Sequence, residues 1–175
     1  MITSALQSSI KNPKILAPET VTKLTDRLKD EYGAHYFYRN AHNWCANNNY
    51  DNAAKFFKGE ADAELEHAEG IQKFLVDWNV IPNMPSIKGN VTFTNLIDIV
   101  NKAYQIEYAL FEAYIANSKE LFTSDLNAFD FLQGYRNIQN QSVIEYSDLL
   151  NAAMLVNVEN NFEVLYFEQT YFPEN

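Results

Sequence analysis

The sequence predicts an all-α protein: a four-helix bundle with one long crossover and a short fifth helix near its C-terminal end. Three observations lead to this class. Apolar residues recur at alternating spacings of three and four along four long segments. The chain contains only five glycines and five prolines, too few for a turn-rich β architecture. Two connections between the segments are short, and one is long and contains prolines.

The size and charge of the chain limit what it can be. A chain of 175 residues, 47% of them hydrophobic, is long enough for one buried core and too short for two. We therefore expect residues 1–17 to form an N-terminal arm and residues 18–175 to form a single domain. A net charge of -10 argues against nucleic acid or an anionic membrane surface as a partner.

Cysteine usage and hydropathy indicate the compartment. The only cysteine, Cys45, excludes an intramolecular disulfide and a cysteine-based metal cluster. The N-terminal residues contain no apolar run of signal-peptide length. No stretch approaches the ~20 apolar residues that span a bilayer. These features predict a cytoplasmic protein with no membrane partner.

The first two helices are expected to form a hairpin. Proline suits the first turn of a helix, so the first helix is expected to begin near Pro18. The asparagine run at 47–49 ends it, and the second helix is expected over about residues 51–79. This short connection makes the two helices antiparallel neighbours.

The second hairpin follows a long connection. Residues 80–92 contain two prolines and a glycine, which is typical of a loop. The third helix is expected over about 93–121, and the fourth, capped by Ser124 or Asp125, to about 155. A linker of about 13 residues reaches ~43–47 Å, and a helix of about 28 residues is ~42 Å long. The linker can therefore return along the whole bundle and make the second and third helices parallel.

Each long helix carries polar residues in the middle of its apolar stripe. Glu64 and His67 are three residues apart and project from one face of the second helix. Glu31, Glu107 and Gln139 hold the corresponding depth in the other three. Burying three carboxylates together without cations would cost several kcal/mol each, unless they took up protons. Two divalent cations would remove that cost, and oxygen ligands with one imidazole favour iron or manganese over structural zinc.

The expected site is asymmetric. A symmetrical di-metal bundle has two Glu-x-x-His pairs, whereas Gln139 and Ser142 take the place of the second pair here. One metal is therefore expected to be held more fully than the other, and the weaker side is expected to exchange its ion. Such a site fits the oxidation and release of iron better than a permanent cofactor.

Several short motifs connect these residues to a known family. They are Glu31 followed seven residues later by Tyr38, Glu64-Leu65-Glu66-His67-Ala68-Glu69, Tyr104-x-x-Glu107, Phe131-Leu132-Gln133-x-Tyr135 leading to Gln139, and Leu165-Tyr166-Phe167. In their order and spacing the chain resembles the non-haem ferritins over roughly residues 18–172. The resemblance implies a ferritin-like fold, a ferroxidase centre acting on Fe(II) with dioxygen or peroxide, and iron storage in a cage usually of 24 subunits.

The resemblance also implies residue roles. It assigns Glu31, Glu64 and His67 to a first iron, and Glu64, Glu107 and Gln139 to a second. Tyr38 matches the tyrosine beside the centre and completes the implied catalytic set. The acids Glu66 and Glu69 match positions where mineral nucleates inside the cage.

Departures from the family pattern narrow these expectations. Leu65 stands where bacterioferritins place the haem-ligating methionine, so we expect no haem. Ala63, Ile138 and Ser142 replace the acids of a third iron site found in some bacterial ferritins, so we expect two irons per subunit.

Other interpretations stay open at this point. One is a di-metal oxidase or peroxide scavenger without a storage role, and another is a non-catalytic helical oligomer whose acids share protons. Glu60 is an auxiliary ligand, a transit site or neither, and for His35 and His42 we favour packing or support of the ligands. The C-terminal stretch carries large apolar residues that predict a subunit contact: Phe162, Leu165, Tyr166, Phe167, Tyr171 and Phe172.

Overall fold

The computed structural model describes residues 15–172, and over that range it contains five α-helices and no strand. The helices are α2 (Pro18–Asn47), α3 (Asp51–Asp77), α4 (Leu96–Ser124), α5 (Leu126–Ala153) and α6 (Asn161–Tyr171). The predicted all-α class is therefore confirmed. Of the expected arm at residues 1–17, all but the last three residues lie outside the described part of the chain.

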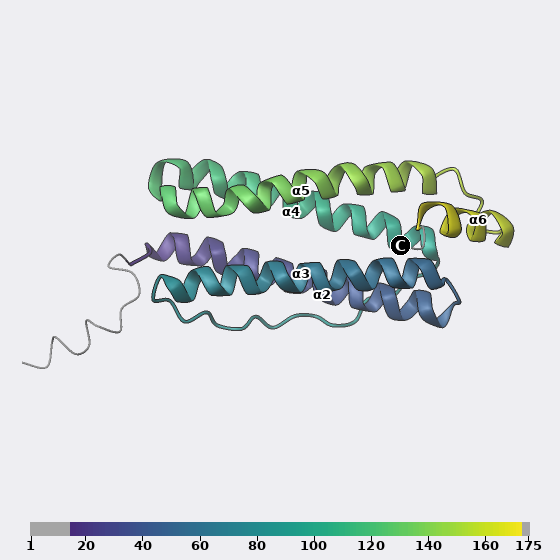
Figure 1. The fold of residues 1–175 in the computed structure, drawn as a ribbon, viewed down its shortest axis with the longest axis horizontal. Helices are drawn as coiled ribbons and strands as arrows, with labels where there is room; N and C mark the ends of the chain where they lie inside the picture. Colours follow the sequence, from purple (N-terminus) through teal and green to yellow (C-terminus); the bar gives the residue numbers. More distant parts are fainter. Residues whose placement is uncertain (1–14, 173–175) are drawn as a thin grey trace, which may run out of the picture.

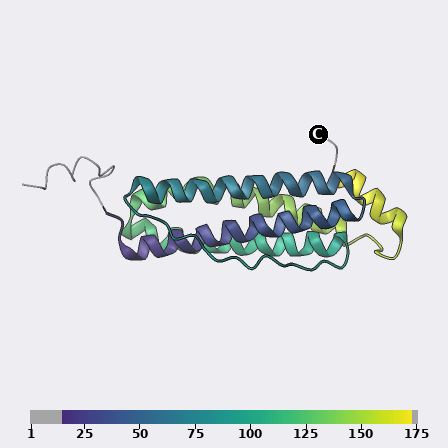
Figure 2. The same ribbon diagram turned by 90° about the horizontal axis from the view of Figure 1, so that it is seen from below.

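The helices form two antiparallel hairpins that lie side by side. Helix α2 pairs with α3, and α4 pairs with α5 (Figure 1). The segment between α3 and α4 runs along the length of the bundle, and this path is visible from both directions (Figures 1 and 2). As a result α3 and α4 are parallel, while α2 and α4 are antiparallel. The predicted single long crossover is confirmed.

Side-chain caps explain where the second hairpin begins and turns. The side chain of Asn95 accepts a hydrogen bond from the Asp98 backbone N–H at 2.8 Å, so α4 begins at Leu96. The expected start at residue 93 was wrong because the cap lies after Phe93. The Asp125 carboxylate accepts from the Ala128 N–H at 3.1 Å and starts α5, so the turn between α4 and α5 contains a single residue.

The bundle interior is apolar towards both ends and polar in the middle. Leu24, Leu28 and Leu75 are among the buried side chains of the apolar layers. Burial of such a residue contributes about 1.5–3 kcal/mol each. The buried polar side chains near mid-length are Glu31, Glu64, Glu107 and Gln139. The other buried polar side chains among the described residues, Thr20, Ser118 and Glu168, lie nearer the helix ends. None of the helices within residues 15–172 is both long and apolar enough to span a membrane.

Helix α6 covers the end of the bundle at which α3 begins (Figure 1). The Glu168 carboxylate accepts hydrogen bonds from the backbone N–H groups of Asn52 and Ala53, at 2.7 and 3.0 Å. These bonds cap α3, whose own N-cap residue supplies no side-chain hydrogen bond. Phe167 of α6 and Phe172, which follows it, are buried, and the Phe172 ring packs against Phe56 and Phe57 of α3.

Candidate metal centre

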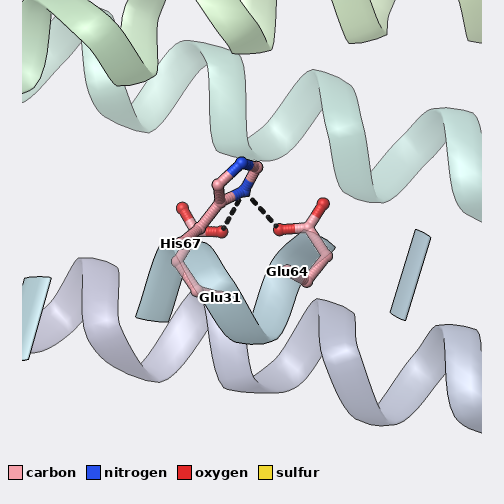
Figure 3. A group of neighbouring side chains, drawn as sticks. All are labelled: Glu31, Glu64 and His67. Atoms are coloured by element: carbon pink, nitrogen blue, oxygen red, sulfur yellow. Dashed lines mark hydrogen bonds and ion pairs between the residues drawn. The ribbon is translucent and has the colours of Figure 1, made fainter. Parts of the chain in front are cut away.

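The first group of polar side chains joins α2 to α3. Glu31 comes from α2, and Glu64 and His67 come from α3. One potential ligand atom from each of these residues lies within 4.8 Å of the other two. The Nδ1 atom of His67 lies 3.2 Å from Oε2 of Glu64 and 3.6 Å from Oε2 of Glu31 (Figure 3). Two carboxylates and an imidazole therefore lie close enough together to share one cation.

This group is dry on one side and partly open on the other. Glu31 and Glu64 are 1% and 5% exposed, whereas the His67 side chain is 21% exposed. His67 reaches the partly open side because it lies three residues from Glu64, about one helical turn along the same face. The imidazole therefore forms the side by which a small ion could enter.

Burial and mutual contact shift the pKa values of all three groups, upwards for Glu64 and His67 and downwards for Glu31. Burial strongly raises the pKa of Glu64, with the neighbouring charge of Glu31 acting in the same direction. Burial lowers the pKa of His67, but hydrogen bonds to Glu31 and Glu64 outweigh this and raise it to about 10. For Glu31, burial acts upwards, but the neighbouring His67, Glu64 and Tyr114 side chains outweigh it and bring the net pKa below its ordinary value. Protons thus compensate here for the charge that a cation could neutralise.

The group fits a divalent cation. Oε2 of Glu31 is buried and has no hydrogen-bond partner among the residues that the structure describes. A buried carboxylate oxygen without a partner is costly, and a cation between Glu31, Glu64 and His67 would satisfy it. The donor set of two carboxylates and an imidazole, without a thiolate, matches iron or manganese better than a structural zinc ion.

The second group, Tyr38, Glu107 and Gln139, joins α2, α4 and α5 and already contains internal hydrogen bonds. The Tyr38 hydroxyl donates to Oε1 of Glu107, and the Gln139 amide donates to Oε2. The same amide nitrogen donates to the Glu107 backbone carbonyl at 3.0 Å. Burial raises the pKa of Glu107 to about 7 despite these two side-chain bonds. Both carboxylate oxygens of Glu107 therefore accept hydrogen bonds. The Gln139 amide must rotate away before a cation can bind between Glu107 and Gln139.

Glu60 lies beside this second group. It accepts a hydrogen bond from the Tyr146 hydroxyl at 2.9 Å, and burial raises its pKa. The Tyr146 ring in turn stacks on Tyr38, with centroids 6.0 Å apart. Glu60 is therefore connected through two tyrosines to Glu107 rather than grouped with Glu31, Glu64 and His67.

The two other histidines tie α2 to α3. His35 Nδ1 donates to the Ala61 carbonyl at 2.6 Å, and His42 Nδ1 donates to the Ala54 carbonyl at 2.8 Å. Because each ring bonds to the backbone of the facing helix, both contribute to packing. Glu66, by contrast, is exposed on the opposite side of α3 from Glu64.

Two tyrosines near the first group, Tyr114 and Tyr135, had no site role assigned from the sequence, although Tyr135 belongs to one of the family motifs. The Tyr114 hydroxyl donates to Oε1 of Glu31. The Tyr135 ring stacks on Tyr114, with centroids 5.5 Å apart and planes 20° from parallel, and its hydroxyl donates to the His67 carbonyl at 3.0 Å. Tyr114 follows Glu107 by seven residues, the same spacing as Glu31 and Tyr38. That repeated spacing is the signal by which the sequence could have indicated Tyr114.

Two antiparallel hairpins, one long crossover and buried carboxylates at mid-length together define the class of carboxylate-bearing helical bundles. A sequence model of the ferritin-like domain matches residues 21–155. The chain therefore belongs to the ferritin family, as its motifs predicted.

Individual relatives agree with this assignment at low identity. The chain is 24% identical to a bacterial non-heme ferritin of Campylobacter jejuni over 149 residues, covering 84% of this chain and 89% of that protein. It is 22% identical to a bacterial non-heme ferritin of Escherichia coli over 155 residues, or 87% and 93% of the two chains. A probable bacterial non-heme ferritin-like protein of Haemophilus influenzae is 23% identical over 140 residues, or 78% and 84%. The similarity therefore extends over most of each chain.

Proposed function

We propose that the protein is an iron-storage ferritin whose mid-bundle centre oxidises Fe(II) to Fe(III). The observation that carries the proposal is the buried Oε2 of Glu31, which accepts no hydrogen bond and faces Glu64 and His67 in a chain of the ferritin family. Glu31, Glu64 and His67 take one Fe(II), and Glu64, Glu107 and Gln139 take the other. Glu64 is shared by both, and Tyr38 orients Glu107 through its hydrogen bond.

The oxidation balances with two iron ions as substrate. Each Fe(II) loses one electron, and dioxygen takes up two electrons and two protons to give hydrogen peroxide. Where peroxide is the oxidant, it takes up two electrons and two protons and its O–O bond breaks to give two waters. Buried carboxylates favour this direction, because the higher charge of Fe(III) gains more from nearby anions than Fe(II) does. The protons held on Glu64 and His67 leave as the ions bind.

Storage requires an assembly, and the surface supports one. Large apolar side chains of α6 and the segment before it are exposed: Met154, Leu155, Phe162, Leu165, Tyr166 and Tyr171. Apolar residues gathered in this way are typical of a subunit contact. We propose that the chains form a closed homo-oligomeric cage. A cage of 24 chains of 20.2 kDa would have a mass of about 480 kDa, which size-exclusion chromatography can detect. Exposed Glu66 and Glu69 are the acids proposed to nucleate mineral on its inner surface.

The test is to add Fe(II) to the metal-free protein in air and follow ferric absorbance. Oxidation much faster than in buffer, with about two Fe(II) consumed per chain in the fast phase, supports the proposal. Oxidation no faster than in buffer refutes it. Size-exclusion chromatography with iron analysis of the peak separates storage from its rival. A dimer with fast oxidation but no retained mineral would indicate a di-metal oxidase or peroxide scavenger instead.

A further inference from the structure

We propose that Tyr114 is a positioning residue of the metal centre. It orients Glu31 as Tyr38 orients Glu107. Its hydroxyl holds Oε1 of Glu31, so that Glu31 presents only Oε2 to a cation. This inference rests on the proposed function, because it assumes that Glu31 is a metal ligand.

The arrangement of the two tyrosines is reciprocal. On α2, Tyr38 lies seven residues after Glu31, and on α4, Tyr114 lies seven residues after Glu107. Because α2 and α4 are antiparallel, each tyrosine meets the glutamate of the other helix. Tyr38 therefore donates to Glu107, and Tyr114 donates to Glu31. Two turns of helix and an antiparallel pairing are enough to produce both bonds.

The hydrogen bond decides how Glu31 can bind. A carboxylate binds a metal through one oxygen or chelates it through both. Tyr114 is 1% exposed, as is Glu31, so bulk water does not compete for Oε1 in this part of the bundle. With Oε1 engaged, Glu31 is oriented before a cation arrives and is held to one-oxygen binding. Pre-orientation of a ligand by a hydrogen bond raises metal affinity, since less order must be created on binding.

Tyr114 is itself held in place by Tyr135. The Tyr135 ring stacks on the Tyr114 ring, and the Tyr135 hydroxyl donates a hydrogen bond to the His67 carbonyl at 3.0 Å. This anchor needs a glycine at position 70, because a Cβ there would overlap the Tyr135 hydroxyl oxygen. A methyl group at Gly70 must therefore displace Tyr135 and loosen its contact with Tyr114. The glycine at position 59 of the same helix has no such neighbour within 4 Å.

The test measures binding of Zn²⁺, which needs no oxidation, to the metal-free protein by calorimetry. The wild-type protein is expected to bind two Zn²⁺ in separable steps. Tyr114→Phe, which keeps the ring and its stacking, should weaken the tighter step ~10–100-fold and leave the other within about threefold. Tyr38→Phe should do the reverse. Gly70→Ala should weaken the same step as Tyr114→Phe by a smaller factor, and Gly59→Ala should change neither.

Bound cobalt(II) gives a second measurement that a merely structural role would not move. Its visible absorption weakens as its coordination number rises, so Tyr114→Phe should reduce the intensity per bound ion if Glu31 becomes free to chelate. Circular dichroism establishes that each variant is folded.

Three results would overturn the inference, and they are distinguishable. If the wild-type protein binds no Zn²⁺, the proposed function fails and the role of Tyr114 fails with it. If the wild-type protein binds but Tyr114→Phe has unchanged affinity and an unchanged cobalt spectrum, only the role of Tyr114 is refuted. If Tyr114→Phe weakens both Zn²⁺ binding steps equally, Tyr114 stabilises the fold as a whole and does not specifically position Glu31.

Discussion

The two groups of polar side chains at mid-bundle differ in whether a cation can bind without breaking a hydrogen bond. We call them the Glu31 half (Glu31, Glu64 and His67) and the Glu107 half (Tyr38, Glu107 and Gln139). On the Glu31 half, one oxygen of Glu31 is buried, accepts no hydrogen bond and faces the other two side chains. On the Glu107 half, Tyr38 and Gln139 already occupy both carboxylate oxygens. The difference follows from a single residue type, because an amide at position 139 can donate where a carboxylate could not. One half is therefore open, and the other must break a hydrogen bond before it binds.

The largest effect is expected from the residue that both halves share. Glu64→Ala should reduce the initial rate of Fe(II) oxidation by at least ~100-fold, because each proposed iron loses a ligand. The rate of ferric absorbance increase measures this. Glu66→Ala is the matched control, since Glu66 lies two residues away but is exposed. Equal rates for both variants would mean that the centre is not where iron reacts.

The comparison also predicts how the metal-free protein responds to pH. The pKa of Glu107 is raised to about 7 from its ordinary 4.5, so the folded state binds the extra proton. Its contribution to stability is fully present below pH 4.5 and is lost as the pH rises through 7. The free energy of unfolding should therefore fall from pH 5 to pH 8, by about 2–3 kcal/mol for this group. Denaturant unfolding at the two pH values measures the change.

A variant isolates the share of Glu107 in that change. Glu107→Gln cannot ionise, so its free energy of unfolding should fall less over the same pH range than that of the wild-type protein. His67, whose pKa is raised from 6.5 to about 10, acts in the same direction from pH 6.5 upwards and is present in both proteins. An identical pH dependence in the two proteins would show that Glu107 is already ionised at pH 5.

The asymmetry itself can be removed by Gln139→Glu. The new carboxylate cannot donate to Glu107 when both are ionised, so the metal-free protein should lose on the order of 1–3 kcal/mol of stability. The weaker Zn²⁺ step should in turn become roughly tenfold tighter, about 1.4 kcal/mol, because an anionic ligand replaces a neutral one. Calorimetry and thermal unfolding on the same sample measure both. A more stable metal-free protein with unchanged Zn²⁺ affinity would contradict the comparison.

The smallest effect is expected far from the centre. Glu168→Ala removes the cap that α6 places on α3, which should cost about 1 kcal/mol of stability. Zn²⁺ affinity should stay unchanged, since Glu168 belongs to neither half. Thermal unfolding measures the loss, and Gln169→Ala, at the neighbouring exposed position of the same short helix, provides a surface control. A loss of Zn²⁺ binding in Glu168→Ala would show that the bundle end and the centre are coupled.

Much of this architecture could be predicted from the sequence. Spacings of three and four located the helices, and the length of one connection gave the crossover. The start of α4 was misplaced because Phe93 is as apolar as the helix that follows, and the capping role of Asn95 was not considered. The polar interruption of each apolar stripe indicated Glu31, Glu64, His67, Glu107 and Gln139, and the family motifs then assigned them to two irons.

What the sequence did not give is the direction of individual side chains. Spacing places Gln139 at the right depth, but it does not say that the amide donates to Glu107. It likewise does not say that Tyr135 stacks on Tyr114, because that contact joins α4 and α5 through rotamers that only packing selects. Only the structure therefore shows that Glu107 already accepts hydrogen bonds on both oxygens while Oε2 of Glu31 accepts none.

The most direct test of the central claim is anomalous diffraction from crystals soaked anaerobically in Fe(II). The account predicts a strong iron peak within coordination distance of Glu31, Glu64 and His67. A weaker second peak should lie beside Glu107, with the Gln139 amide turned from its present hydrogen bond. Iron found only on exposed acids such as Glu66, with the hydrogen bonds of Glu107 intact, would contradict it.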